Sequence, residues 1–392
     1  MLFESIRTNS FRNLSDTDIF TNAKDVFLIG KNGQGKSNFL EALYFCAYAS
    51  SFRTTRDSEI ARNAFREDLP KDLSAYSSED MSYKDASRGK NEKEFSAEVK
   101  LSQSVNDKIL VKFEKGKKSI FINGKSAEDR AELLSIAPSI VFCHEDMEFV
   151  NGSPERRRWF FDQTLSLYDP VYLEDLRRYR RVLKSRNAVL RNISHEHSRG
   201  NAENPESILD AIDPQIAVYG LNLMKKRETA AKEFSAVFGR LYEEVSGISG
   251  ITVQYIQSWQ IGGDILSHLQ KRRAAEFAAG ISLSGPHRDR YVFAHNNSDF
   301  TVKASTGQKR LLALLLRTAQ ACRFSQMTGQ NPILLLDDVL LEMDGEKRRK
   351  FISVLPGYSQ AFYTFLPEEP YRNYQKADTL VYSVENGALT SI

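Results

Sequence analysis

The chain has 392 residues, of which 41% are hydrophobic and 27% are charged, and its formal net charge is only +3. This composition and length are typical of a globular protein with about two domains. Because the net charge is small, attraction to nucleic acid would have to come from local basic patches. No stretch approaches the ~18 apolar residues that a membrane span needs, which excludes a transporter that carries its own membrane domain.

The three cysteines, Cys46, Cys143 and Cys322, are isolated in sequence, and the N-terminal segment lacks the apolar core of a signal peptide. Isolated cysteines in odd number indicate reduced thiols rather than a disulfide framework. We therefore expect a cytoplasmic protein.

The first third of the chain is rich in strand patterns. The expected elements are strand segments within 3–14 and 25–30, a helix at 37–49, and strands at 95–101, 108–114 and 118–122. Asn123-Gly124 ends the last of these strands as a turn. Residues 71–94 are polar and charged, and they predict an exposed loop insertion.

The pattern becomes helical from residue 154 to about residue 248, with a polar break at 194–207. Strand patterns return at 251–258 and 290–303, and they are followed by a helix at 308–323 and the very apolar strand "PILLLDDV" at 332–339. This order predicts an α/β fold with one discontinuous domain, residues 1–150 and 250–392, and a mainly helical arm inserted at 151–249.

One glycine-rich stretch, "GKNGQGKSN" at 30–38, matches the P-loop pattern and lies between an apolar strand and a helix. Glycines let successive amides face phosphate oxygens, and the helix that follows adds its positive N-terminal end. Lys36 would reach the outer phosphates, and the Ser37 hydroxyl would bind Mg²⁺. The residues expected to bind ATP here are Gly30, Lys31, Asn32, Gly33, Gln34, Gly35, Lys36, Ser37 and Asn38.

The strand "ILLL" ends in Asp337 and Asp338, which are candidates for the metal carboxylate and the catalytic acid. Asp337 would hold Mg²⁺ together with Ser37, and Asp338 would orient or deprotonate the attacking water. The alternative for this segment is a core strand that ends in a solvated turn.

A second helix start, at Ser305, also suits an anion, because Ser305 can cap the helix and Gly307 permits close backbone approach. Since the P-loop already encloses one face of the triphosphate, this helix end would serve the nucleotide of another subunit. That arrangement is a head-to-tail nucleotide sandwich dimer. The alternative is an ordinary capped core helix.

Several stretches together resemble one family. They are "FRNL" (11–14), "GKNGQGKSNFLEAL" (30–43), "SFRTTRDSEI" (51–60), "EDMEFVNGSPERRRWFFD" (145–162), "YRRVLKSRNAVL" (179–190), "GPHRD" (285–289), "STGQKRLLAL" (305–314) and "LLLDDVLLEMD" (334–344). The chain resembles the RecF family, in the ATP-binding-cassette branch shared with SMC proteins. The resemblance implies an ATP-binding-cassette head with a P-loop and mixed sheets, and an inserted helical arm.

The resemblance also implies roles for single residues. Ser305, Gly307 and Gln308 would form a signature motif that contacts the γ-phosphate bound in the partner. Asp344 would lie at the dimer interface, Arg12 near the nucleotide, and Thr364 at the catalytic switch position. The chain departs from the family pattern at Ser37, His144, Leu341 and Arg290.

DNA contacts are expected from basic segments. Residues 154–191 contain ten basic and five acidic residues, and the candidates are Arg177, Arg178, Arg181 and Lys184, together with Arg53 and Arg56. The alternative is a solvated helix face with internal ion pairs. The resemblance implies that the ligand is duplex DNA near single-strand gaps and that the protein is associated with the nucleoid.

The expected function combines these features. ATP would join two subunits and close a clamp on DNA, and slow, DNA-stimulated hydrolysis would open it. The resemblance implies recombinational repair, replication restart, the SOS response and loading of the strand-exchange recombinase, with RecR as a partner and RecO as a second candidate. The alternatives are an SMC-like DNA tether or another soluble ATPase of the same class. A nuclease is disfavoured because too few residues follow Asp344 for a further catalytic domain.

Overall fold

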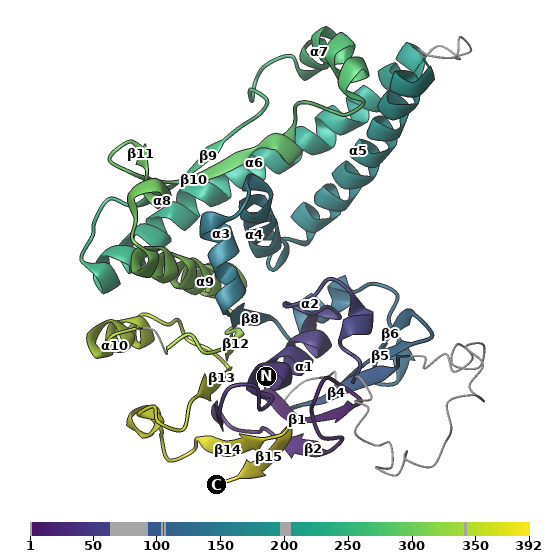
Figure 1. Ribbon diagram of the computed structural model, residues 1–392. Coiled ribbons are helices and arrows are strands. Elements are labelled where there is room, and N and C mark those ends of the chain that lie inside the picture. The colour runs from purple at the N-terminus through teal and green to yellow at the C-terminus, as the bar shows by residue number, and fades with distance from the viewer. Residues whose placement is uncertain (1, 63–92, 103–104, 106, 197–204, 341–342) are drawn as a thin grey trace, which may run out of the picture. The chain divides into compact units, whose positions relative to one another are not determined.

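The computed structural model describes residues 2–62, 93–102, 105, 107–196, 205–340 and 343–392, and these form two compact units (Figure 1). The first unit comprises Met1–His144, Pro332–Glu342 and Tyr358–Ile392. The second comprises Glu145–Asn331 and Met343–Gly357. The mixed α/β architecture with a helical insertion is the predicted fold class.

A six-stranded, mainly parallel sheet forms one half of the first unit. Its order is β15 (Ala388–Ser391), β14 (Leu380–Glu385), β3 (Asp25–Ile29), β13 (Gln360–Phe365), β12 (Ile333–Leu336) and β8 (Ser139–Phe142), with only β15 antiparallel to its neighbour. All residues of β3, β8, β12 and β13 are buried, as apolar strands in a parallel sheet usually are. Helix α1 (Lys36–Tyr48) follows β3 and packs against β8 and β13.

An antiparallel sheet forms the other half of this unit. Its order is β2 (Asp18–Phe20), β1 (Leu2–Asn9), β4 (Phe95–Ser102), β5 (Lys108–Glu114), β6 (Lys117–Ile122) and β7 (Lys125–Ser126). Side chains alternate between buried and accessible along β4 and β5, and α1 covers the buried face. The short elements of the unit are η1 (Asp57–Glu59), α2 (Ala131–Ile136) and η5 (Tyr371–Tyr374).

The second unit is built around two long helices, α5 (Pro170–Glu196) and α6 (Pro205–Ser246), which pack against each other. Tyr172, Tyr179, Leu223 and Trp259 are buried in their shared core. The other elements are η3 (His144–Met147) at the boundary, α3 (Glu148–Asn151), α4 (Pro154–Ser166), β9 (Thr252–Ile256), α7 (Ile265–Ala279), η4 (Pro286–Arg288), β10 (Arg290–His295), β11 (Ser298–Asp299), α8 (Phe300–Lys303), α9 (Thr306–Thr328) and α10 (Gly345–Ser353).

The second unit extends beyond the expected arm at 151–249. Residues 250–331 belong to it because β9 and α9 pack on α6, and α7 packs on α5 and α6. The expected loop at 71–94 lies outside the described residues apart from Lys93 and Glu94. No helix in the described parts of the chain is both long enough and apolar enough to cross a bilayer.

The helix expected at 37–49 and the strands expected at 95–101, 108–114 and 118–122 are confirmed as α1, β4, β5 and β6. The pair of strand runs expected at 290–303, with its turn at Asn296-Asn297, is confirmed as β10 and β11, and the expectation is wrong only at its end. The chain turns at Asn296 and Asn297 after β10, and residues 300–303 form α8. The side chain of Asp299 caps this helix by accepting a hydrogen bond from the amide of Thr301. The cap starts a helix where the sequence pattern predicted that the strand would continue.

Candidate nucleotide-binding site

The P-loop joins β3 to α1, and its glycines are required by the local backbone. Gly33 and Gly35 have φ values of 79° and 116°, which L-residues with a side chain rarely adopt. A Cβ on Gly30 would lie 2.5 Å from the carbonyl oxygen of Val384 on β14. The loop therefore needs glycine at positions 33 and 35 because of their backbone conformation, and at position 30 because another strand lies so close.

Lys36 is buried and folds back over the loop. Its ammonium group donates hydrogen bonds to the carbonyl oxygens of Gly30, at 2.7 Å, and Lys31, at 3.2 Å. These two hydrogen bonds keep the ammonium group of Lys36 inside the turn of the P-loop. A cation within such a concavity, at the start of a helix, suits the outer phosphates of a nucleotide.

Ser37 and Asp337 come together although they are 300 residues apart in the chain. The Ser37 hydroxyl donates a hydrogen bond of 2.7 Å to Oδ1 of Asp337, which follows the last residue of β12. A hydroxyl and a carboxylate are hard oxygen ligands of the kind that Mg²⁺ prefers, with water and phosphate completing its octahedron. The two residues expected to hold Mg²⁺ thus lie within hydrogen-bond distance of each other, and their oxygen donors would fit the ion.

Asp338 has a φ of 51°, a strained value for a residue with a side chain. Its amide donates a hydrogen bond of 2.7 Å to the hydroxyl oxygen of Thr364 on β13. The same hydroxyl donates to Oδ1 of Asp338 at 2.8 Å. Thr364 therefore holds both the backbone and the carboxylate of Asp338. Three of the four residues expected to be catalytic, Asp337, Asp338 and Thr364, form one cluster beside Ser37, and the fourth, Lys36, precedes Ser37 in the loop.

Arg12, which was expected near the nucleotide, forms a forked ion pair with Glu41 on α1. Its Nε lies 3.0 Å from Oε2 of Glu41, and its Nη2 lies 2.8 Å from Oε1. Asn38 accepts a hydrogen bond from Arg53 at 2.7 Å and donates one to Asn13 at 2.7 Å. Arg53 and Arg12 are thus both connected to the helix that begins at the P-loop.

Sequence reasoning missed Glu41 and Asn13. Glu41 was detectable as a lone acid among the apolar residues of a helix expected to be buried. Asn13 carried no such signal, since its role depends on the fold that brings it to Asn38. Of the other loop residues, Lys31 and Asn32 are exposed, and Gln34 accepts a hydrogen bond from the Asn386 amide at 2.7 Å.

The expected signature residues belong to the second unit. Ser305 and Gln308 form a capping box at the start of α9, in which the Ser305 hydroxyl accepts from the Gln308 amide and the Gln308 side chain accepts from the Ser305 amide. Gly307 has no atom within 4 Å of the position that a Cβ would take. Asp344 caps α10, and hydrogen bonds from Lys347 lower its pKa.

Nine of the ten basic residues of 154–191 divide into two groups, and the tenth, Arg191, is exposed on α5. Arg177, Arg181 and Lys184 follow one another at helical spacing on one face of α5, where Arg181 and Lys184 are exposed. Arg178 is exposed and donates to Glu174 at 2.7 Å. The second group has structural partners within the unit and comprises Arg156, Arg157, Arg158, Arg180 and Arg186. The composition of this segment therefore overstates the charge that it offers to DNA.

The "GPHRD" segment is part of a buried network. Asp289 accepts hydrogen bonds from the Ser258 amide, at 2.8 Å, and from Arg227, at 3.0 Å. His287 lies between the Tyr179 hydroxyl, at 2.7 Å, and the Ser282 carbonyl oxygen, at 3.1 Å. These contacts give the segment a structural role in the second unit. Arg290, the departure that follows it, is exposed at the start of β10, His144 is exposed in η3, and Leu341 lies outside the described residues.

The comparisons with known proteins point to one family. Residues 2–390 match the family model described as RecF/RecN/SMC N terminal domain. A DNA replication and repair protein RecF of Treponema pallidum (strain Nichols) is 38% identical over 381 residues, covering 97% of this chain and 98% of that protein. The RecF protein of Bacillus subtilis (strain 168) is 28% identical over 399 residues, covering 99% and 100%.

A solved structure described as the recombination mediator protein RecF with ATP, in the RecFOR pathway, is also similar. It is 25% identical and covers 100% of this chain and 97% of that one, with a TM-score of 0.79. Sequence and fold are thus similar over the whole chain, including the P-loop unit and the helical unit. The chain belongs to the RecF family of DNA replication and repair proteins, within the wider RecF/RecN/SMC group of ATP-binding-cassette ATPases.

Proposed function

We propose that this chain is a recombination mediator that uses ATP to dimerise head to tail and to clamp duplex DNA near single-strand gaps. Slow, DNA-stimulated hydrolysis then releases the DNA, and the protein helps to load the strand-exchange recombinase together with RecR and RecO. The observation that carries the proposal is that one chain has two helix starts that suit phosphate groups. The first half-site is the P-loop with Asp337, Asp338 and Thr364, and the second half-site is the Ser305-capped start of α9.

The residues of the first half-site have different roles. The loop amides and Lys36 bind the phosphates, while Ser37 and Asp337 hold Mg²⁺, which neutralises charge on the phosphates when it is bound. Asp338, restrained by Thr364, orients a water molecule and accepts its proton. Restraint matters because a catalytic group that is already in place needs no reorganisation during the reaction.

The second half-site supplies donors but no metal ligand. The α9 start offers amides of its first turn, the Ser305 hydroxyl and the positive end of a 23-residue helix. A group that binds the nucleotide only in the dimer makes ATP a ligand of the dimer, and ATP then shifts the population toward it. Hydrolysis removes the γ-phosphate that both half-sites bind, and the dimer opens.

Sedimentation of the full chain with ATP, ADP and gapped DNA tests this proposal. We expect dimers with ATP, monomers with ADP, and a longer-lived ATP dimer in Asp338→Asn. Ser305→Arg should stay monomeric while a single chain still binds ATP. Ser298→Arg, a change of an exposed serine in the same unit, is the matched control. ATP-dependent dimers of Ser305→Arg would contradict the sandwich.

A further inference from the structure

The antiparallel sheet of the first unit has one face that α1 covers and one face that no described helix covers. Buried side chains of β4 and β5, such as Val99 and Val111, face α1, and the alternate residues face away. The strand register places those alternate residues in rows across the sheet. One row runs from Glu98 on β4 to Leu110 on β5 and Phe121 on β6.

This outward face is basic where β4, β5 and β6 form it. The register places four lysines on it, Lys100, Lys108, Lys112 and Lys117, with two acidic residues, Glu98 and Glu114, of which Glu114 lies 3.7 Å from Lys112. Lys100 on β4 lies directly opposite Lys108 on β5, although like charges in that relation destabilise a sheet. Glu98 lies 2.8 Å from Lys108 and offsets part of that repulsion.

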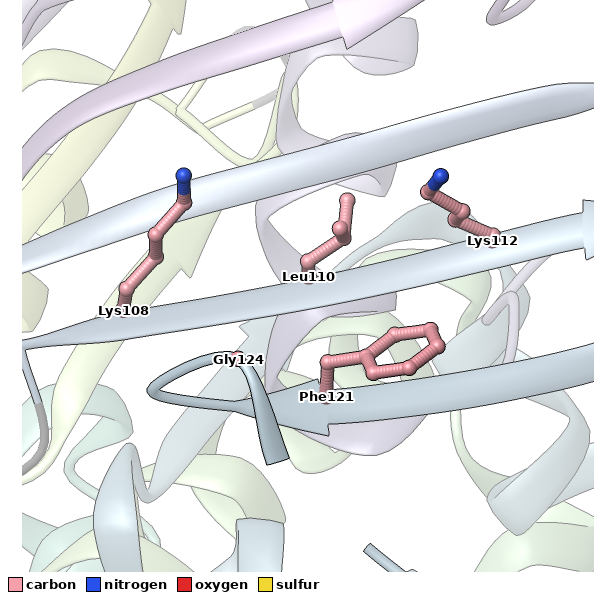
Figure 2. Close-up of a pocket in the computed structure, with 5 residues that line it drawn as sticks. All are labelled: Lys108, Leu110, Lys112, Phe121 and Gly124. Carbon is pink, nitrogen blue, oxygen red and sulfur yellow. The ribbon is translucent and has the colours of Figure 1, made fainter. Parts of the chain in front are cut away.

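A hollow of about 220 Å³ lies on this face and is lined by Lys108, Leu110, Lys112, Phe121 and Gly124. Figure 2 shows Leu110 and Phe121 on neighbouring strands, with Lys108 and Lys112 on either side of Leu110 along β5. The two lysines are four residues apart on one strand, which places their Cα atoms about 14 Å apart. Gly124 keeps the β6–β7 turn free of a side chain beside the ring.

We propose that this hollow binds an unpaired base of single-stranded DNA, stacked on Phe121, with the flanking phosphates on Lys108 and Lys112. The inference rests on the proposed function in one respect, that the ligand is DNA, and it adds a site for the single strand of the gap. An apolar ring between two cations matches the alternation of flat base and phosphate along a strand. The lining residues include no amide or carboxylate side chain that reads base edges, so binding is independent of sequence.

Photochemical crosslinking tests this site directly. The full chain is irradiated with an oligothymidylate that contains 5-iodouracil, and the adduct is located by mass spectrometry. We expect an adduct at Phe121. In anisotropy titrations with oligothymidylate, Phe121→Leu should bind about tenfold more weakly, whereas Phe121→Tyr, which keeps a ring, should bind as the parent does. Lys112→Gln should lower the slope of log K against log salt by about 0.7.

Phe20→Leu is the matched control. Phe20 is 53% exposed on the same face, but it lies on β2, four strands from β6, or about 19 Å away. It should bind as the parent does. Equal binding by Phe121→Leu and the parent, with no adduct at Phe121, would overturn the proposal. Weaker binding of the lysine variant alone would also overturn it, because the face would then bind phosphates without stacking a base.

Two further measurements distinguish a DNA-binding site from a peptide-binding site and test this site independently of the dimer. If a glutamate-rich peptide bound in a Phe121-dependent manner and oligothymidylate did not, the site would be a peptide site and the proposal would be wrong. Sedimentation of Phe121→Leu with ATP should show unchanged dimers. Failure of the parent to dimerise would refute the clamp but not this site, since crosslinking at Phe121 needs no second subunit.

Discussion

Thr364 Oγ1 lies 2.7 Å from the amide nitrogen of Asp338 and 2.8 Å from Oδ1 of the same residue. One hydroxyl therefore accepts from the backbone and donates to the side chain of a residue whose φ is 51°. A strained residue persists only where its surroundings hold it, and here the holding group comes from the neighbouring strand, β13.

We expect Thr364→Val to lower ATP hydrolysis by about 10- to 100-fold, because valine keeps the shape of threonine but makes neither hydrogen bond. ATP binding should change little, since Lys36 does not contact this hydroxyl and Ser37 reaches it only through Asp337, whose contact with Thr364 is long at 3.4 Å. Thr364→Ser keeps the hydroxyl and is the control. Steady-state hydrolysis and binding of a fluorescent nucleotide measure the two effects. Equal hydrolysis by the valine and serine variants would show that the hydroxyl has no positioning role.

A second prediction concerns the Arg12–Glu41 pair. Glu41 has a fully buried side chain, and Arg12 is 22% exposed. Arg12→Ala should lower the free energy of unfolding by about 2–3 kcal/mol, less than the full cost of an orphaned charge, because Ser51 and Arg53 still contact Glu41. Urea titration provides the measurement.

The double variant Arg12→Ala/Glu41→Gln should lose less free energy of unfolding than the sum of the losses in the two single variants. The reason is that Glu41→Gln removes the buried charge that Arg12→Ala would leave without its partner. Arg56→Ala serves as the control, since Arg56 is 79% exposed and pairs only loosely with Glu59. Strict additivity of the two changes would mean that the pair contributes no coupling energy.

The P-loop and the paired aspartates were predictable because their chemistry depends on adjacent residues. The partner of Glu41 was not predictable, because Arg12 is 29 positions away and becomes adjacent only in the fold. The end of the inserted unit was misplaced for a related reason. Strands β9 and β10 pair with each other and pack on α6, and nothing in the local alternation at 251–258 indicates which unit a strand joins.

The lysines of β5 and β6 were overlooked because a strand sends successive residues to opposite faces. Counted along the chain, Lys117 and Lys118 are neighbours, but Lys118 pairs with Asp57 and lies over the Phe45 ring on the α1 side. Only the register shows which lysines share a face with Phe121. By contrast, the helical spacing of Arg177, Arg181 and Lys184 is visible in the sequence itself.

A third prediction compares two glycines. Gly30→Ala should destabilise the protein and abolish ATP binding, because its Cβ would lie 2.5 Å from the Val384 carbonyl oxygen on β14. Gly307→Ala should fold normally, since nothing lies within 4 Å of the new Cβ and the residue is in the first turn of α9. Thermal unfolding and nucleotide binding distinguish them. Normal ATP binding by Gly30→Ala would contradict the prediction, because it would mean that β14 can move away from the new Cβ without changing the conformation of the P-loop.

The last prediction concerns His287, whose environment favours the neutral ring. Nδ1 accepts from the Tyr179 hydroxyl, and Nε2–H donates to the Ser282 carbonyl oxygen. Burial, assisted by nearby Arg288, Arg158 and Arg186, lowers the pKa of His287 from 6.5 to about 4. Between these two values the unfolded chain binds a proton that the folded chain does not. The stability that His287 contributes is therefore complete above about pH 6.5 and is lost as the pH falls toward 4.

The loss due to this one residue should approach roughly 3 kcal/mol over that interval. His287→Gln keeps a donor and an acceptor but does not titrate, so it removes this part of the pH dependence. Both tryptophans, Trp159 and Trp259, belong to the second unit, so their fluorescence during urea titration reports on the unit that contains His287. The parent should be the more stable protein at pH 7, and its advantage should shrink at pH 4.5. An advantage that stays constant between the two pH values would mean that the ring binds a proton in the fold as readily as in the unfolded chain, and the prediction would be wrong.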